Sequence, residues 1–161
     1  MQFTIRKAKL TDLKAIQELN LKLFKKEAKE YDPTLSLEWT FGRSGTEYFK
    51  ERITEEDGCV LVAEVKGKIV GYLAGGITET DSYRKVGRLA EIENMFVEEE
   101  YRNQGIGGKL IQKFLDWAKR QKVERVKVVA FALNYKALRF YRKHGFKEYE
   151  VVLEKEVAQD V

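Results

Sequence analysis

The sequence predicts an α/β (α+β) fold in which helices flank a mixed β-sheet. Runs rich in β-branched residues alternate with segments whose apolar residues recur every three or four positions, so strands and helices should share one core. The 161 residues suit one domain spanning 1–161, with its core at about 2–153. No apolar run is long enough to cross a bilayer, and the single cysteine excludes an internal disulfide, so we expect a cytoplasmic protein.

In the first half, alternating apolar and polar residues predict strands, and apolar residues at helical spacing predict helices. The stripe from Leu13 to Phe24 is typical of an amphipathic helix. Two β-rich runs on either side of Gly67 predict a hairpin. The expected elements are a strand at 2–8, a helix from 13 to about 29, a helix at 46–53, and strands at 59–65 and 69–77.

The second half is expected to alternate strands with helices. A run from 87 to 97 predicts a long strand, and an apolar stripe beginning at Ile106 predicts the next helix. Asn134 can cap a later helix, which Gly145 would end. The remaining strands are expected at 123–131 and 146–153, which gives the order β-α-α-β-β-β-α-β-α-β.

A strand that leads into a glycine-rich helix start, at residues 91–110, points toward function. Gly105, Gly107 and Gly108 lack a Cβ, so phosphates could approach the backbone N–H groups at the start of the helix. A P-loop is excluded because a leucine follows Lys109 where serine or threonine is needed. A dinucleotide-binding fingerprint is excluded because seven residues separate the strand from the first glycine. A glycine-containing helix start without a ligand is the remaining alternative.

Two motifs resemble those of the GNAT family of N-acetyltransferases. The stretch 102–107, which reads arginine-x-x-glycine-x-glycine, resembles the family's acetyl-CoA-binding signature, Gln/Arg-x-x-Gly-x-Gly/Ala. The stretch 134–146 resembles the family's Asn-x-x-Ala-x-x-Phe-Tyr-x-x-x-Gly-Phe segment. Both motifs come in the family's order, and the order of elements fits the family from about residue 2 to 153.

The resemblance implies a GNAT fold and acetyl-CoA as cosubstrate, with no metal. It implies that the glycine loop cradles the pyrophosphate, that a backbone N–H near Met95 or Phe96 meets the acyl oxygen, and that residues like Val97 pair with pantetheine. The cofactor-binding residues implied in this way are Met95, Phe96, Val97, Arg102, Asn103, Gln104, Gly105, Ile106, Gly107, Gly108, Lys109, Asn134 and Tyr141.

Acetyl transfer to an amine needs a base and an acid. A lysine-like amine has a pKa of about 10 and must lose a proton before it attacks the thioester. Glu91 and Glu93 lie two residues apart and should face the same side of the strand, so either is a candidate base, with Glu91 slightly favoured. The alternative is that both only keep an exposed sheet face soluble. Tyr141 stands at the family's acid position and would protonate the leaving thiolate.

Charge is distributed unevenly along the chain. Residues 102–147 carry 13 Lys or Arg against two acidic residues, a net +11, whereas residues 1–101 carry 16 basic and 19 acidic residues, a net −3. A basic half suits nucleic acid or the phosphates of coenzyme A, and the glycine loop inside it favours the nucleotide. The acidic first half favours a cationic amine as the acceptor.

The sequence therefore predicts an enzyme that passes acetyl directly from acetyl-CoA to a primary amine, either a small cationic amine or a protein amine. The alternative is a non-catalytic acyl-CoA-binding sensor or interaction module on the same fold. No base-reading motif and no membrane segment is recognisable, so neither nucleic acid nor a membrane is an expected partner. A homodimer is left open.

Overall fold

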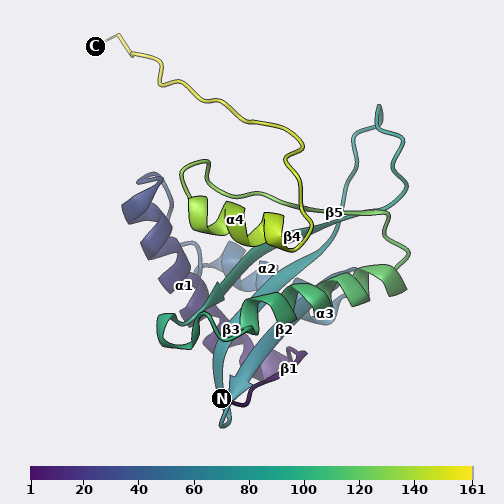
Figure 1. Ribbon diagram of the computed structural model, residues 1–161. Helices are drawn as coiled ribbons and strands as arrows, with labels where there is room; N and C mark the ends of the chain where they lie inside the picture. The colour runs from purple at the N-terminus through teal and green to yellow at the C-terminus, as the bar shows by residue number, and fades with distance from the viewer. Residues whose placement is uncertain (161) are drawn as a thin grey trace.

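The computed structural model describes residues 1–160 and contains a five-stranded sheet in the order β1-β2-β3-β4-β5 (Figure 1). Neighbouring strands pair antiparallel from β1 to β4, whereas β4 and β5 pair parallel. The strands are β1 (Thr4–Lys7), β2 (Gly58–Val65), β3 (Lys68–Thr78), β4 (Leu89–Val97) and β5 (Arg125–Val128). The helices are α1 (Leu13–Glu30), α2 (Arg43–Thr54), α3 (Ile106–Arg120) and α4 (Tyr135–Lys143), with 3-10 turns η1 (Leu10–Asp12) and η2 (Glu99–Tyr101).

The predicted hairpin is formed by β2 and β3, which Lys66 and Gly67 connect. Both residues have positive φ angles, 50° and 79°, and a two-residue turn of this kind matches the twist of the strands on either side. Val65 lies directly opposite Lys68 across the turn. The expected hairpin is therefore confirmed in position, and Lys68 belongs to β3 rather than to the turn.

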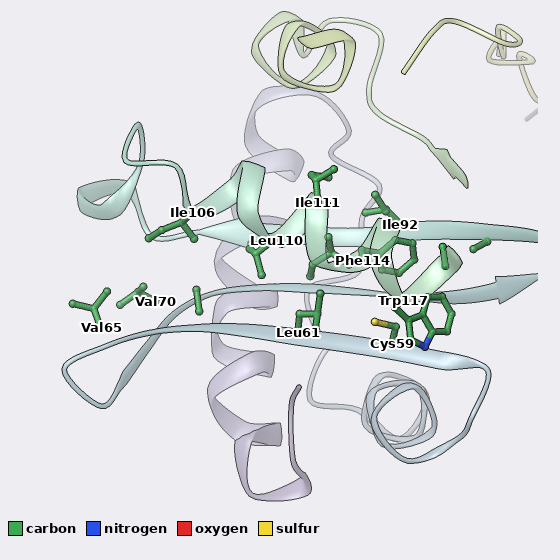
Figure 2. Packing of buried hydrophobic residues seen from close by; sticks show 14 residues of the cluster. Cys59, Leu61, Val65, Val70, Ile92, Ile106, Leu110, Ile111, Phe114 and Trp117 are labelled. Atoms are coloured by element: carbon green, nitrogen blue, oxygen red, sulfur yellow. The ribbon is translucent and has the colours of Figure 1, made fainter. Parts of the chain in front are cut away.

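Helices cover both faces of the sheet, so the sheet separates two apolar clusters. On one face, α3 packs against inward side chains of β2, β3 and β4 (Figure 2). On the other face, α1 and α2 pack against β2 and β3. Burial on both faces explains why β2 and β3 are almost continuously apolar. The α3 cluster is centred on Leu61, Ile92, Leu110, Phe114 and Trp117. The α1–α2 cluster is centred on Ile16, Phe49, Val62 and Tyr72.

β4 and β5 separate part-way along their length. Their parallel pairing ends where Ile92 lies opposite Val128, while β4 continues to Val97. No strand within residues 1–160 pairs with β4 beyond Ile92 on the side of β5. We call residues 93–97 the open edge of β4. It leaves backbone N–H and C=O groups available to an extended ligand.

A β-bulge marks the start of the open edge of β4. Asn94 lies opposite Ala74 and Ile92 lies opposite Gly75, which leaves Glu93 as the extra residue. The structure places the bulge shortly before the predicted acyl-binding positions at 95 and 96.

The prediction of a buried strand at 123–131 is only partly correct. β5 has four residues, and its side chains alternate between exposed and half-buried. It forms the edge of the sheet in the described chain, so only one of its sides has a strand neighbour. The sequence pattern could not show that this strand ends the sheet.

The predicted final strand at 146–153 is wrong. Residues 146–160 form no strand, and the apolar side chains of Val151, Val152 and Leu153 are exposed. Phe146 still packs against Tyr141 of α4, with ring centroids 5.7 Å apart. Figure 1 shows the rest of the tail running away from the sheet. An alternating pattern permits a strand, but a strand also needs a neighbour to pair with, and the four-residue β5 leaves only a short edge for pairing.

No helix within the described residues has both the length and the apolar character needed to span a membrane.

Candidate active site

The loop between β4 and α3 has a backbone shaped to bind an anion. Asn103 and Gly105 have left-handed φ angles of 60° and 88°, and Gly105 immediately precedes α3. Asparagine and glycine tolerate this conformation better than other residues. Because Gly105 has no side chain with which to cap α3, the N–H groups of the first turn stay available to a ligand.

Two further glycines in this first turn face α4 at close range. A Cβ built on Gly107 would lie 3.1 Å from the Phe140 ring, and one on Gly108 would lie 2.9 Å from the His144 ring. α4 thus packs closely on the start of α3. His144 is the C-cap of α4, and its half-buried ring lies against this turn. The four-residue spacing of Phe140 and His144 on one helix face was the signal that could have revealed this contact.

Arg102 ties the glycine loop to the end of β4. Its Nε donates to the carbonyl oxygen of Val97 at 2.7 Å, and its guanidinium lies 5.0 Å from the centroid of the Phe96 ring. The other guanidinium N–H groups of Arg102 make no hydrogen bond within residues 1–160. Arg102 therefore positions the loop, in addition to its predicted role toward phosphates.

The side chains of the other predicted loop residues differ in their exposure to solvent. Gln104 and Lys109 are exposed, whereas the Ile106 side chain is buried in the α3 cluster, so only its backbone N–H could meet a ligand. A recess of about 490 Å³ opens beside the loop. Its polar lining includes Lys109, which supplies positive charge, and His144, which supplies ring nitrogen atoms for hydrogen bonding.

The side chains of the open edge of β4 point alternately to the two faces of the sheet. Met95 and Val97 pack toward α3, whereas Phe96 packs toward α1 and α2. These three side chains therefore contact the apolar clusters on the two faces of the sheet. What the edge offers a ligand is its backbone.

Glu93 is held by an ion pair and a phenol. Arg52 of α2 donates to both Glu93 carboxylate oxygens, at 2.8 and 2.9 Å, and the hydroxyl of Tyr48 donates to one of them at 2.8 Å. The two charged side chains are only 19% and 22% exposed. Glu93 is thus an anchor between α2 and the bulge, which limits its freedom to exchange protons.

Glu91 is less firmly held than Glu93. Its carboxylate lies 3.6 Å from the Nζ of Lys127 in β5. Burial raises the pKa of Glu91, and the neighbouring charge of Glu93 adds to this increase while Lys127 opposes it. Because the two glutamates act on each other electrostatically, the expectation that they face the same side of the sheet is consistent with the structure. Their catalytic roles stay a prediction.

A buried hydrogen-bond network lies under the bulge, and the sequence analysis missed it. The hydroxyl of Tyr72 donates to Asn94 at 2.6 Å and accepts from Asn20 of α1 at 3.0 Å. Asn94 in turn donates to the hydroxyl of Tyr48 at 3.1 Å, which links the network to Glu93. An asparagine within the buried stripe of α1 was the available sequence signal.

Tyr141 is enclosed on the inward side of α4. Burial raises its pKa to about 12, and the negative charge of Glu27 on α1 contributes to the increase. Its ring packs edge-on against Phe140 and Phe146. Asn134 caps α4 as expected, because its side-chain oxygen accepts from the N–H of Ala137 at 3.1 Å.

The described residues contain no group of three or more histidine, cysteine or acidic side chains that could hold a metal ion.

Comparisons with known proteins place this arrangement in a family. The model of the acetyltransferase (GNAT) family matches residues 15–146. An uncharacterised N-acetyltransferase of Methanocaldococcus jannaschii is 32% identical over 150 residues, which are 93% of this chain and 63% of that protein. An N-alpha-acetyltransferase of Sulfurisphaera tokodaii is 27% identical over 156 residues, which are 94% of this chain and 84% of that protein.

A solved structure resembles the fold over almost the whole chain. An aminoglycoside N-acetyltransferase in complex with CoA matches with a TM-score of 0.77 at 16% identity, covering 97% of this chain and 95% of that chain. The chain spans 63% of the Methanocaldococcus protein, so the whole length of that relative is not represented. The family match includes the glycine loop and α4 with Tyr141. The chain belongs to the GNAT family of N-acetyltransferases.

Proposed function

We propose that this protein passes acetyl directly from acetyl-CoA to a primary amine, without an acyl-enzyme intermediate. The observation that supports this most is the open edge of β4, which leads into the uncapped start of α3. Tyr141 packs against the same apolar cluster as Met95 and Val97 of that edge. An extended pantetheine would pair with the edge as an added strand does, and its pyrophosphate would meet the helix start.

The glycine loop would hold the nucleotide end of acetyl-CoA. The N–H groups of Ile106, Gly107 and Gly108 are suited to the pyrophosphate, and the exposed Lys109 and Gln104 lie beside them. Asn103 and Arg102 shape the loop, and Asn134 keeps its side-chain N–H₂ for the cofactor while its oxygen caps α4. A backbone N–H at Met95 or Phe96, just after the bulge, would stabilise the negative charge on the acyl oxygen.

In the proposed reaction, a carboxylate of β4 takes a proton from the acceptor ammonium. The freed nitrogen lone pair attacks the thioester carbonyl, the carbon–sulfur bond breaks, and the sulfur leaves as a thiolate that must be protonated. We assign the base to Glu91, because Glu93 is bound by both Arg52 and Tyr48. The long contact between Glu91 and Lys127, together with the raised pKa of Glu91, favours proton uptake.

Tyr141 is the proposed donor to the departing sulfur. A thiol has a pKa of about 8.5, so complete proton transfer from a phenol whose pKa is about 12 would cost roughly 5 kcal/mol. With the ordinary tyrosine pKa of about 10, the pKa difference between the phenol and the thiol would be smaller. Tyr141 therefore contributes chiefly as a hydrogen-bond donor that meets the sulfur as its negative charge develops.

The acceptor is proposed to be a cationic amine. One of the relatives is an N-alpha-acetyltransferase, and an aminoglycoside N-acetyltransferase shares the fold. The acidic balance of residues 1–101 agrees with a positively charged acceptor. A reducing compartment such as the cytoplasm is part of this proposal, because the single cysteine, Cys59, is free and buried.

Release of free thiol from acetyl-CoA over a panel of amines tests this proposal. The panel contains spermidine, an aminoglycoside, and peptides with a free N-terminus or a free lysine. Turnover with one class would establish the transfer and identify the acceptor. Saturable binding of acetyl-CoA without turnover of any amine would instead favour an acyl-CoA-binding sensor.

A further inference from the structure

The β-bulge changes which backbone groups of β4 face β3. A Cβ built on Gly75 would lie 2.1 Å from the carbonyl oxygen of Glu91, so this oxygen, which precedes the bulge, lies close to β3. After the bulge, the oxygen that faces β3 belongs to an even-numbered residue, because a Cβ on Gly71 would lie 3.2 Å from the oxygen of Phe96. The side on which odd-numbered residues present their backbone groups therefore reverses at Glu93, the extra residue.

Met95 and Val97 consequently present their backbone groups to the open edge of β4. N–H groups alternate between the two sides of a strand, and the N–H of Glu98 donates to the oxygen of Val70 in β3 at 2.8 Å. The residues one and three positions earlier therefore point away from β3. The carbonyl oxygen of Val97 agrees with this, because it accepts from the Nε of Arg102 in the glycine loop. Of the two candidate donors to the acyl oxygen, Met95 is thus the one whose N–H is turned to the open edge.

One chain of hydrogen bonds holds the bulge from the α1–α2 side of the sheet. From donor to acceptor, it runs through Thr40, Asn20, Tyr72, Asn94, Tyr48 and Glu93. Its first three side chains are fully buried. Every member donates toward the carboxylate, so the bonds polarise one another in the same direction. Burial raises the pKa of both phenols, which keeps their hydroxyl groups protonated as donors.

The chain specifies the bulged register of β4. Glu93 and Asn94 are consecutive, yet both side chains bond on the α1–α2 side, while Ile92 and Met95 on either side of them pack toward α3. A strand without a bulge would send one of the two polar side chains to the opposite face. Buried polar groups cost free energy when they lose their partners, so the bulged register is the one in which all members of the chain are paired.

We propose that Tyr72 and Asn94 are positioning residues that hold the N–H of Met95 toward the acyl oxygen of acetyl-CoA. The proposal rests on the proposed acetyl transfer and specifies how its oxyanion donor is oriented. Tyr72 lies directly opposite Phe96 in the sheet, and its hydroxyl donates to Asn94, two residues earlier in β4. It therefore contacts β4 on both sides of Met95. Both side chains act on the reaction through the backbone that they hold.

Infrared difference spectroscopy measures this orientation on acetyl-CoA that carries an isotope label at its carbonyl carbon. A preorganised hydrogen bond polarises the thioester carbonyl, so the stretching frequency in the wild-type complex should be lower than in free acetyl-CoA. We expect Tyr72→Phe to lose about half of this shift or more, and its kcat to fall about tenfold. Its KM for acetyl-CoA should stay within about twofold of the wild type, because the pyrophosphate is held elsewhere.

Two further variants separate positioning from general stability. Ile16→Ala is the matched control, because Ile16 is buried in the same α1–α2 cluster and its apolar side chain forms no hydrogen bond. It should lose stability and keep the wild-type carbonyl frequency and kcat. Tyr48→Phe keeps the ring contacts with Trp39 and Phe49 but interrupts the chain nearer its end. It should reproduce the frequency change even if Tyr72→Phe does not fold.

The spectrum and the thiol-release assay can fail independently. A carbonyl shift in the wild type that Tyr72→Phe reduces, without turnover of any amine, would refute the transfer and support the positioning. Wild-type frequency and kcat in the folded variants Tyr72→Phe and Tyr48→Phe would refute the positioning and leave the transfer in place. An equal change in Ile16→Ala would overturn the positioning as well, because a loosened core would explain it. So would a wild-type carbonyl frequency equal to that of free acetyl-CoA.

Discussion

The ring of Phe140 occupies the space that a side chain on Gly107 would need. A Cβ on Gly107 would lie 3.1 and 3.2 Å from two ring atoms of Phe140. The glycine-rich start of α3 therefore serves two purposes. It exposes N–H groups to a ligand, and it lets α4 approach closely enough to place Tyr141 against the same cluster as β4.

Alanine substitutions at Gly107 and at Gly108 should separate the role in ligand binding from the role in helix packing. Alanine favours a helix over glycine by about 1 kcal/mol. Because the Phe140 ring is packed against the core, Gly107→Ala should nevertheless destabilise the protein by about 1–2 kcal/mol through overpacking. Gly108→Ala should be neutral or slightly stabilising, since the facing His144 is at the surface end of α4 and can move.

Urea denaturation checks this pair of variants. The double variant Gly107→Ala/Phe140→Leu should recover most of the lost stability, which a double-mutant cycle would show. Equal effects of Gly107→Ala and Gly108→Ala would contradict the packing argument. If Gly108→Ala folds normally and binds acetyl-CoA weakly, the ligand-binding purpose of the glycines is measured separately from their packing purpose.

The two glutamates of β4 should respond differently to substitution. Glu93→Gln leaves the partly buried guanidinium of Arg52 without a charged partner, so we expect a loss of about 2 kcal/mol of stability. Glu91→Gln removes only the long contact with Lys127 and should change stability by less than about 0.5 kcal/mol. Its kcat should fall about 100-fold if it is the base. Thermal unfolding and thiol release measured on both variants decide the assignment, and the opposite pattern would transfer the role to Glu93.

Removal of the Tyr141 hydroxyl should slow the reaction and leave the fold intact. Tyr141→Phe keeps the ring contacts with Phe140 and Phe146, and no hydrogen bond to the hydroxyl is lost in the described chain. We expect kcat to fall about 100-fold with little change in acetyl-CoA affinity. Tyr135→Phe is the matched control, because Tyr135 is an exposed tyrosine on the same helix. A wild-type kcat in Tyr141→Phe would remove this residue from the mechanism.

Glu27 should make the stability of the protein depend on pH. The pKa of Glu27 is about 7 in the folded chain, above the value of about 4.3 expected when unfolded. Between these values the folded state binds more protons than the unfolded state, so stability contributed by Glu27 falls as pH rises. Glu27→Gln should consequently be more stable than the wild type at pH 8, by about 1–2 kcal/mol after allowance for solvent screening.

Thermal unfolding at pH 4 and pH 8 measures this dependence. The advantage of Glu27→Gln should disappear at pH 4, where the wild-type carboxyl is protonated in both states. A destabilised Glu27→Gln at pH 8 would mean that the carboxylate has a stabilising partner, which would contradict this prediction.

Several features follow from the sequence because they depend on residues close together in the chain. The hairpin at Gly67, the cap at Asn134 and the glycine-rich start of α3 each involve a few neighbouring positions, and all three are present in the structure. The two family motifs are local in the same sense. They were sufficient to indicate the family, the fold and the position of the predicted cofactor site.

Other features depend on residues that only packing brings together. Arg52 reaches Glu93 over 41 positions in sequence, and no spacing rule predicts that pairing. The separation of β4 from β5 also depends on how the elements pack around the sheet. The missing final strand has the same origin, because its alternating residues provide the pattern while the rest of the molecule must provide the partner. The sequence by itself determined the fold family and the motifs, whereas tertiary structure decided which carboxylates near the site are paired and with which partners.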